Sequence, residues 1–375
     1  MQQVPLIAVD VRMARNSGIG RYIREVAPRV RKLLPEVRWH WVGNTAEEWM
    51  EADRRGTEFV LWPLPVYSYR EHCRTQNACG DADVRWVPHY NVTPGSKARL
   101  VVTMHDVLPL RYASGWRGAL RAIVFRWYLA RIRRHARLVL SNSAFTAKEL
   151  AESARIAGAR VKVTPLGCNL SVEGYNSAVS SKLPAALGAR MTQPVSGYFL
   201  FVGNIKPHKN LSGLLFAWSR VSDQIPEDLV IVGQREGFFT GDPAAARLAD
   251  GLGRRVVFTG HLPDAHLRQL MTGATALVQP SFYEGFGLPV LEAMAAGCPV
   301  ISSNAASLPE VGGEAVIYFD PHNFGSIAEK LVQVSRDDGL RQQLRAAGLV
   351  RAREFTWDRT AELTATALRE VLAMP

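Results

Sequence analysis

Cysteine is scarce in this sequence, and recognisable metal-binding motifs are missing. Four cysteines are spread over 375 residues, and no CxxC pair accompanies the loose group of His72, Cys73 and Cys79. No Asp/Asp pair of the kind that holds a divalent cation is visible either. The sequence therefore predicts no zinc site, no metal centre and no cofactor, and it favours a reduced, cytoplasmic protein.

Long hydrophobic runs are also missing. No stretch approaches the roughly 18 uncharged apolar residues that a membrane helix needs, and MQQVPLIAVDV lacks the pattern of a signal peptide. Apolar residues make up 47% and charged residues 21%, as in globular proteins. A chain of 375 residues exceeds what one hydrophobic core usually supports, so two domains are expected.

Acidic residues are under-represented in the first half of the chain. Residues 1–190 hold 29 Lys+Arg against 15 Asp+Glu, net +14, whereas residues 191–375 hold 16 against 19, net −3. The first half is therefore expected to face an anionic partner, either a lipid surface or nucleic acid. No nucleic-acid-binding module is recognisable, so we predict no nucleic acid. An arginine-rich soluble face that reflects genomic composition is the remaining alternative.

Short apolar, β-branched runs alternate with helical patterns through both halves, which predicts parallel sheets covered by helices on both faces. The runs in the first half are PLIAVDV, FVLWPLP, LVVTMHD, LVLSNS and VKVTPLG; those in the second are YFLFVGN, LVIVGQ, VVFTGH, ALVQPS, PVISSN and AVIYFD. We predict an α/β protein with two Rossmann-like, doubly wound domains that face an interdomain cleft.

The domain boundary is predicted in residues 183–197, where Pro and Gly punctuate the chain and no strand is legible. The first domain would span 1–190 and the second 191–375. A terminal helix over about 357–373 either closes the second domain or crosses back to the first.

Residues 281–298, SFYEGFGLPVLEAMAAGC, place two glutamates around a glycine turn. The turn at Gly287 would expose backbone N–H groups, and a helix would begin at about Leu288. A helix start is a ready anion site. Glu284 before the turn and Glu292 within the helix could each accept two hydroxyl hydrogen bonds, as vicinal diols of sugars offer. A helix-capping glutamate and an exposed one are the alternative.

A cationic loop, GNIKPHKNL, follows the first strand of the same predicted domain. Its lysines and histidine stand between a strand and a helix, where they could be held over a diphosphate. Both segments follow strands of one predicted sheet, so a nucleotide-sugar pocket is favoured over a solvated loop.

The two segments VGNIKPHKN and SFYEGFGLPVLEAMAAGCPVISSNAASLPEVGGEA resemble the retaining GT-B glycosyltransferases of family 4, also called group 1. Glu284 and Glu292 have the family's spacing of a Glu, seven residues and a second Glu. The resemblance covers most of the chain, is strongest over 199–321, and is general to mannosyl- and rhamnosyltransferases.

The resemblance implies a role for each matching residue. Glu284 would contact the transferred hexose, Glu292 the donor ribose, and Lys209 the diphosphate. Amides that bind hexose hydroxyls and phosphate would belong to Phe286, Gly287 and Leu288.

The chain departs from the family pattern where many members place an arginine shortly before that lysine. Asn204, Lys206 and His208 stand there instead, and any of them could supply the missing contact. Loops at Gly233–Glu236 and His261–Leu262 correspond to the rim that binds the base.

Two features of the first half also match. Gly18 and Gly20 form a GxG turn after the first strand, and Ile at position 23 rules out the dinucleotide fingerprint as written. The resemblance implies that this turn lies over the donor diphosphate. His105 ends the strand VVTMHD and would lie near the donor hexose, with Asp106 either orienting it or capping the next loop.

The segment RGALRAIVFRWYLARIRRHARL interleaves arginines with aromatic rings, a combination that suits an anionic bilayer interface. The residues proposed for this membrane and acceptor face are Arg121, Arg126, Trp127, Arg131 and Arg134. We expect the first domain to rest on the inner face of the cytoplasmic membrane.

The sequence therefore predicts a retaining, metal-independent hexosyltransferase. It would move a mannose- or rhamnose-like sugar from a nucleotide diphosphate, with GDP favoured, to a glycan or polyprenyl-diphosphate-linked sugar of a bacterial surface polysaccharide. A nucleotide-sugar 2-epimerase and a non-catalytic nucleotide-sugar-binding protein are the alternatives.

Overall fold

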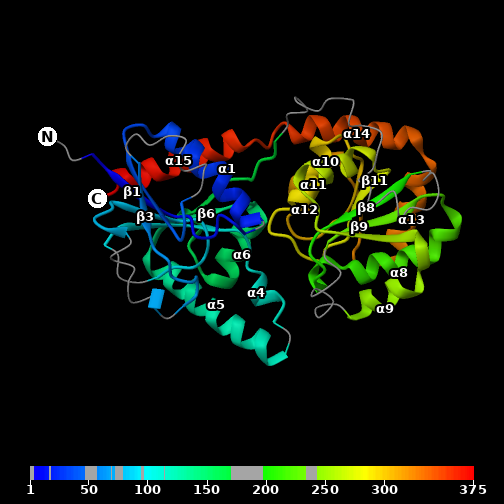
Figure 1. The fold of residues 1–375 in the computed structure, drawn as a ribbon, viewed down its shortest axis with the longest axis horizontal. Coiled ribbons are helices and arrows are strands. Elements are labelled where there is room, and N and C mark those ends of the chain that lie inside the picture. Colours follow the sequence, from blue (N-terminus) through cyan, green and yellow to red (C-terminus); the bar gives the residue numbers. More distant parts are fainter. Residues whose placement is uncertain are drawn as a thin grey trace. The chain divides into compact units, whose positions relative to one another are not determined.

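A computed structural model describes most of the chain and divides it into two compact units. The described residues are 4–16, 18–46, 57–68, 70–71, 79–93, 97–113, 115–169, 197–233 and 243–375. Unit 1 comprises Met1–Gly167 and Trp357–Pro375, and unit 2 comprises Cys168–Thr356. Each unit is built on its own parallel sheet, with helices packed against it (Figure 1).

Within the described residues, the sheet of unit 1 has seven parallel strands in the order β3-β2-β1-β4-β5-β6-β7. Their bounds are β1 Leu6–Asp10, β2 Arg38–Gly43, β3 Thr57–Leu61, β4 Val84–Val87, β5 Arg99–Met104, β6 Ala136–Ser141 and β7 Val161–Val163. Strand β1, in the interior of the sheet, is buried along its whole length, as a parallel strand covered on both faces must be.

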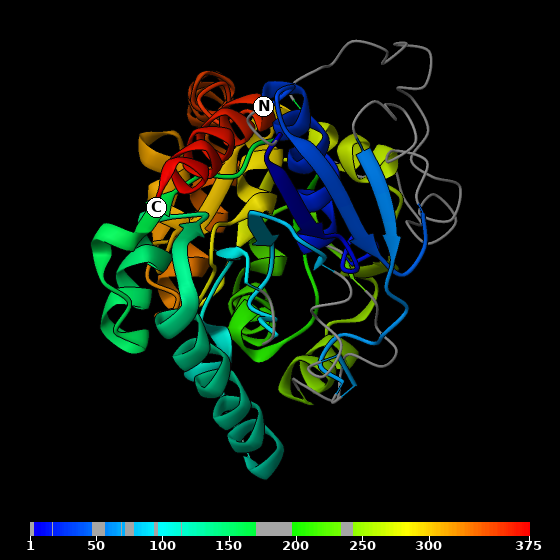
Figure 2. The ribbon, with the colours of Figure 1, turned by 90° about the vertical axis from the view of Figure 1, so that its left-hand side faces the viewer.

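The helices of unit 1 are α1 Gly18–Leu33, α4 Leu108–Arg111, α5 Gly115–His135, α6 Ala144–Ala154 and α15 Trp357–Ala373. Helix α15 lies beside α1 and against β5 and β6 (Figure 2). The Arg99 guanidinium donates to the carbonyls of Val371 and Leu372 at 2.9 and 2.8 Å, which ties the end of α15 to the sheet. The terminal helix thus belongs to unit 1.

Within the described residues of unit 2, six parallel strands run in the order β10-β9-β8-β11-β12-β13. Their bounds are β8 Tyr198–Val202, β9 Asp228–Val232, β10 Val256–Gly260, β11 Ala276–Gln279, β12 Val300–Ser303 and β13 Ile317–Phe319. The helices are α8 Leu211–Val221, α9 Pro243–Gly251, α10 Asp264–Gly273, α11 Leu288–Ala295, α12 Leu308–Gly312, α13 Phe324–Arg336 and α14 Asp338–Ala352.

A hydrophobic core of unit 2 lies between its sheet and helices α8 and α13. Phe199 and Phe201 of β8 pack with Trp218 of α8 and Leu331 of α13, and all four are fully buried. The strand that leads into the cationic loop is therefore rigidly anchored.

The predicted fold class is confirmed: each unit is an α/β domain with a parallel sheet. All six strands expected in the second half are present, and the five expected in the first half are joined by β2 and β4. The boundary expected within 183–197 falls almost entirely outside the described residues.

Candidate functional site

The order in which the chain adds strands to the sheet of unit 2 reverses between β8 and β11. The chain runs outward from β8 through β9 to β10, and on the other side from β11 through β12 to β13. In open α/β sheets, ligands bind beyond the carboxyl ends of the strands at such a switch point. The loops that follow these two strands, residues 203–210 and 280–287, therefore form the candidate site.

The two loops are joined by hydrogen bonds. The Phe282 N–H donates to the His208 carbonyl at 2.8 Å. The side-chain amide of Asn210 donates to the Pro280 carbonyl at 3.0 Å. Asn210 has a φ of 53°, a left-handed conformation that asparagine tolerates better than most residues. The cationic loop is thus fixed against the loop that carries the first glutamate.

Lys209 and Glu284 form an ion pair at the junction of these loops. Lys209 Nζ lies 2.6 Å from Glu284 Oε1 and 2.8 Å from Oε2. The side chains are only 16% and 10% exposed. The structure therefore brings together two residues that are 75 positions apart in the sequence and that the sequence assigned to one site.

The Glu284 carboxylate receives two further hydrogen bonds. Gln279 Nε2 and Ser281 Oγ donate to Oε1 at 2.7 and 2.8 Å. Because a carboxylate accepts only, it fixes the Gln279 amide with its nitrogen toward Glu284. The amide oxygen is buried and has no hydrogen-bond partner among the described residues. These two donors hold the carboxylate in one orientation.

The glycine turn leads into α11 as expected. Gly287 has a φ of 107° and is the residue before the helix, and a Cβ there would lie 2.7 Å from Leu308 Cδ2. Only glycine fits this combination. Leu288 begins the eight-residue helix, and Glu292, half-buried, lies one turn further on. The helix therefore begins four residues after Glu284, beyond the carboxyl end of β11.

Ser307 holds the turn through hydrogen bonds to its backbone. Its hydroxyl lies 2.8 Å from the Glu284 carbonyl and 2.9 Å from the Phe286 carbonyl, so it bridges both ends of the turn. The Phe286 side chain is buried and contacts Phe355 edge-on at 5.9 Å. The Ser307 hydroxyl therefore holds two carbonyls of the turn that precedes α11.

The three residues that replace the family's arginine differ in environment. Asn204 and Lys206 are exposed, whereas His208 is buried. Burial, reinforced by the charges of Lys209 and Lys206, lowers the pKa of His208 to about 4, although Glu284 acts in the opposite direction. His208 is therefore neutral near pH 7, and Lys206 is the cation of this group.

The expected base-binding rim is described only in part. Gly233 follows β9 and pairs with Gly260 at the end of β10, and Leu262 follows as a half-buried residue next to exposed His261. Residues 234–236 lie outside the described residues. Leu262 is two strands removed from β8, so it does not join the Lys209–Glu284 pair.

In unit 1, His105 lies just beyond β5. Its Nε2 is 3.0 Å from the Pro88 carbonyl, and its ring meets Tyr22 edge-on at 5.0 Å. Because a carbonyl only accepts, Nε2 carries the proton and Nδ1 is left as an acceptor. Burial lowers the pKa of His105 to about 4. Asp106 accepts from the Leu108 N–H at 2.9 Å, so it caps the loop.

The expected GxG turn requires correction. Gly18 and Gly20 lie in the first turn of α1, and the tight turn after β1 is formed by residues 12–15. A Cβ on Gly20 would lie 2.4 Å from the Ala14 carbonyl oxygen, so this glycine is required by close packing of helix and turn. Gly18 meets no atom within 4 Å and is exposed.

The arginine-rich segment forms α5. Arg121, Arg126, Trp127 and Arg134 are exposed, as expected of an interaction face. Arg131 is half-buried and lies 4.9 Å above the Trp127 ring, and burial lowers the pKa of its guanidinium. Figure 2 shows the N-terminal end of α5 extending past the sheet of unit 1.

Two family models match the chain along successive segments. Residues 16–172 match the family described as "Glycosyltransferase Family 4", and residues 191–350 match "Glycosyl transferases group 1". The chain belongs to this glycosyltransferase family. The family resemblance drawn from Glu284, Glu292 and the cationic loop is thereby confirmed, whereas retention of configuration stays a prediction.

Three known proteins illustrate the relationship. The chain is 33% identical over 238 residues to O-antigen chain mannosyltransferase B of Escherichia coli, covering 62% of this chain and 61% of that protein. Its fold matches sucrose-phosphate synthase of Thermosynechococcus elongatus with a TM-score of 0.74 at 18% identity, over 98% and 99% of the two chains. It matches Anabaena HepE in complex with UDP and glucose with a TM-score of 0.70 at 17% identity, over 98% and 100%.

These matches show the GT-B fold and the family. The chain spans less than two thirds of the length of the curated mannosyltransferase that it matches. Across the residues that the structure describes, no helix combines the length and apolar character needed to cross a membrane. The same described residues contain no cluster of three or more His, Cys, Asp or Glu side chains placed to hold a metal ion.

Proposed function

We propose that this glycosyltransferase moves a hexose from a nucleotide-diphosphate sugar to a hydroxyl group of a glycan or polyprenyl-diphosphate-linked sugar, with the anomeric configuration retained. The observation that carries the proposal is the Lys209–Glu284 pair at the switch point beside the start of α11. An ammonium group and a helix start suit pyrophosphate oxygens, and a carboxylate suits sugar hydroxyls.

The donor would exchange partners within this pair. Lys209 would turn from the Glu284 carboxylate to a pyrophosphate oxygen, and the released carboxylate would accept hydrogen bonds from the hexose. Gln279 and Ser281 would keep the carboxylate in place during this exchange, because their hydrogen bonds do not depend on Lys209.

The reaction would then be a same-face substitution. The bond between the anomeric carbon and the phosphate oxygen breaks, and the acceptor oxygen bonds to the same face of that carbon. The acceptor proton passes to the departing phosphate. Lys209 and the amides of Phe286, Gly287 and Leu288 would stabilise the charge on this leaving group, which is the main electrostatic demand of the step.

Other residues would complete the donor contacts. Lys206 supplies the second cation, since His208 is neutral, and Glu292 would bind the ribose hydroxyls. In unit 1, taken by itself, His105 would accept a hydroxyl hydrogen bond through Nδ1, and the backbone at Gly18 is exposed.

The proposed sugar is mannose, its proposed carrier is GDP, and the proposed setting is assembly of a bacterial surface polysaccharide. Similarity to an O-antigen chain mannosyltransferase supports the sugar and the setting. We further propose that the protein works on the inner face of the cytoplasmic membrane, a placement supported by the exposed arginines and Trp127 of α5.

We also propose that transfer requires no resident metal, because Lys209 and the helix start provide positive charge at the leaving group. The rate should be unchanged by EDTA. Loss of transfer in EDTA that Mg²⁺ restores would contradict this part of the proposal.

Nucleotide binding and transfer test the whole proposal. Thermal unfolding is measured with UDP, GDP, ADP and dTDP, and the preferred nucleotide at 100 times its Kd should stabilise the protein by about 2.7 kcal/mol. Transfer is then measured with the matching sugar nucleotides. Lys209→Ala should lower kcat/KM by about 100- to 1000-fold, while Lys330→Ala, a lysine of α13, leaves it unchanged.

Product analysis separates the alternatives. A new glycoside with the donor's anomeric configuration supports the proposal. Interconversion of free nucleotide sugars identifies an epimerase, and nucleotide binding with neither transfer nor slow donor hydrolysis identifies a non-catalytic binding protein.

A further inference from the structure

Helix α5 carries an apolar stripe on its solvent face. Trp116 and Ile123 are 73% and 61% exposed. The other large apolar side chains that face solvent on this helix are Leu120, Val124 and Trp127. These positions recur every three or four residues and therefore lie on one side of the helix. The opposite side is buried through Ala122, Phe125, Tyr128, Leu129 and Ile132.

The ionised side chains on this helix are all cationic. Seven arginines lie in or directly after α5: Arg117, Arg121, Arg126, Arg131, Arg133, Arg134 and Arg137. No aspartate or glutamate occurs within Gly115–His135. An apolar strip bordered by arginine is the pattern of a helix that lies in the interface of an anionic bilayer.

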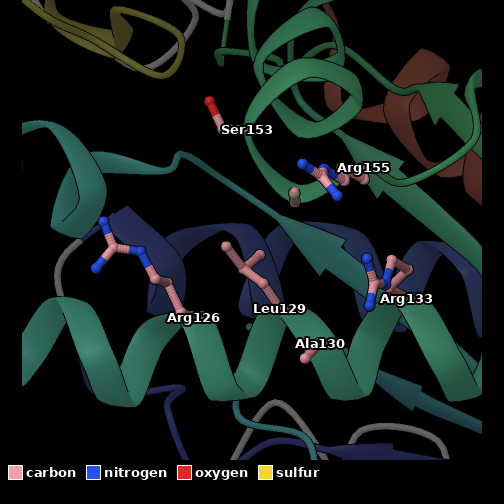
Figure 3. Close-up of a pocket in the computed structure, with 7 residues that line it drawn as sticks. Arg126, Leu129, Ala130, Arg133, Ser153 and Arg155 are labelled. Carbon is pink, nitrogen blue, oxygen red and sulfur yellow. The ribbon is translucent and has the colours of Figure 1, made fainter.

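An open pocket of about 210 Å³ lies along one flank of this helix. Its lining includes Arg126, Leu129, Ala130, Arg133, Ser153 and Arg155. Figure 3 shows Arg126 and Arg133 projecting from α5 on the side that faces Arg155. Two helical turns, or about 10.5 Å, separate the first two arginines along the axis, and Leu129 with the small Ala130 forms the floor between them.

The three guanidinium groups of the pocket have no carboxylate partner among the residues that the structure describes. Arg155 ends α6 with a φ of 53°, a left-handed conformation that is unfavourable for a long side chain. Three like charges around one open space repel each other until an anion occupies it. Guanidinium groups match phosphate oxygens in pairs.

We propose that this pocket binds the phosphate group of an anionic membrane lipid while the apolar stripe of α5 enters the bilayer interface. Ile123 and Trp127 precede Arg126 and Ala130 by three residues, so the stripe runs along the rim of the pocket. The lining offers no aromatic ring on which a base could stack. The inference rests on the proposed membrane association and names its ligand.

Vesicle binding tests this pocket. Phosphatidylcholine vesicles carry either phosphatidic acid or a fatty acid, adjusted to the same zeta potential. Arg155→Asn removes the guanidinium and suits the left-handed backbone, while Arg134→Gln removes one exposed arginine of α5 outside the pocket. Arg155→Asn should weaken binding to phosphatidic acid vesicles at least tenfold. It should affect fatty-acid vesicles no more than Arg134→Gln does.

Each other outcome overturns the inference. Equal losses for Arg155→Asn and Arg134→Gln would mean diffuse charge attraction without a pocket. A further outcome is that inorganic phosphate stabilises the wild-type protein but not Arg155→Asn, while the wild-type protein binds phosphatidic acid vesicles no better than fatty-acid vesicles. This result would assign the pocket to a soluble phosphate. Failure of the wild-type protein to bind either vesicle would remove the membrane association as well. Nucleotide thermal shifts, which Arg155→Asn should leave unchanged, report the transferase proposal separately.

Discussion

At the scale of single residues, the centre of the site is one carboxylate with three donors. The Glu284 carboxylate accepts hydrogen bonds from the Lys209 ammonium group, the Gln279 amide and the Ser281 hydroxyl. Lys209 can turn toward a ligand, because it is a long, flexible side chain that is partly exposed. Gln279 and Ser281 are buried beside the strand end and cannot. The latter two are positioning residues for the carboxylate.

Ser281→Ala should lower kcat/KM about tenfold. The substitution removes one hydrogen bond to a buried charged group, worth about 1.5–3 kcal/mol, and lets the carboxylate rotate. The expected signature is a lower kcat in steady-state kinetics, with Tm reduced by a few degrees.

Ser302→Ala is the matched control for that variant. Ser302 is also a buried serine at the end of a strand of the same sheet, but its hydroxyl bonds the Ser303 carbonyl and not the site. Equal activity losses in the two variants would show that Ser281 acts on the fold alone.

At this scale the sequence predicted the residues of the site but not the shell that holds them. Glu284 and Lys209 were recognised by motif, whereas Gln279, Ser281 and Ser307 were missed. A glutamine and a serine at the end of the apolar run ALVQPS were a usable signal, since buried polar groups need partners. Which group they would bond was not predictable, because the partners meet only in the folded turn.

At the scale of elements, the turn before α11 depends on a glycine. Gly287→Ala should destabilise unit 2 by about 2 kcal/mol or more. The backbone φ of 107° is unfavourable for alanine, and the added Cβ would lie 2.7 Å from Leu308 Cδ2. Denaturant unfolding measures the loss. Gly251→Ala in α9, where a Cβ meets nothing within 4 Å, is the control and should be neutral or slightly stabilising.

The solvent face of α5 makes a second prediction at this scale. Ile123→Glu should weaken binding to anionic vesicles at least tenfold, since a charge replaces an apolar side chain that enters the interface. Val350→Glu on α14 is the control, because Val350 is 64% exposed and Ile123 61%. Co-sedimentation with vesicles measures both. Identical behaviour of the two variants would exclude α5 as the membrane-facing element.

The elements that the sequence predicted best are those with long, uniform patterns. All six strands of unit 2 are apolar runs bounded by turn residues. Strand β2, RWHWVG, was missed because it alternates aromatic and polar residues, and β4, VRWV, because it is short and contains Arg85. The buried Arg85 guanidinium donates hydrogen bonds to the carbonyl and the hydroxyl of Thr93. No local sequence pattern encodes this contact.

At the scale of the whole molecule, both units contain histidines that folding keeps neutral. Burial lowers the pKa of His89 to about 3 and those of His105 and His208 to about 4. Below pH 6.5 the unfolded chain takes up protons that the folded protein does not. Stability should therefore be complete above about pH 6.5 and fall as the pH drops toward 4.

The predicted loss of stability at lower pH is checked by denaturant unfolding between pH 7.5 and pH 4.5. Each histidine contributes a slope of up to about 1.4 kcal/mol per pH unit between its two pKa values. His105→Asn and His208→Asn should each flatten the pH profile. A wild-type protein equally stable at pH 5 and pH 7 would contradict the assignment of these histidines as neutral in the folded protein.

The position of α15 has a consequence for the order in which the protein acquires its structure. Unit 2 is a continuous segment, but unit 1 needs residues 357–373, which cover α1 and anchor to Arg99. During synthesis, residues 4–167 leave the ribosome long before the helix that completes them. Unit 1 can therefore complete the packing around its sheet only after the whole of unit 2 has been synthesised.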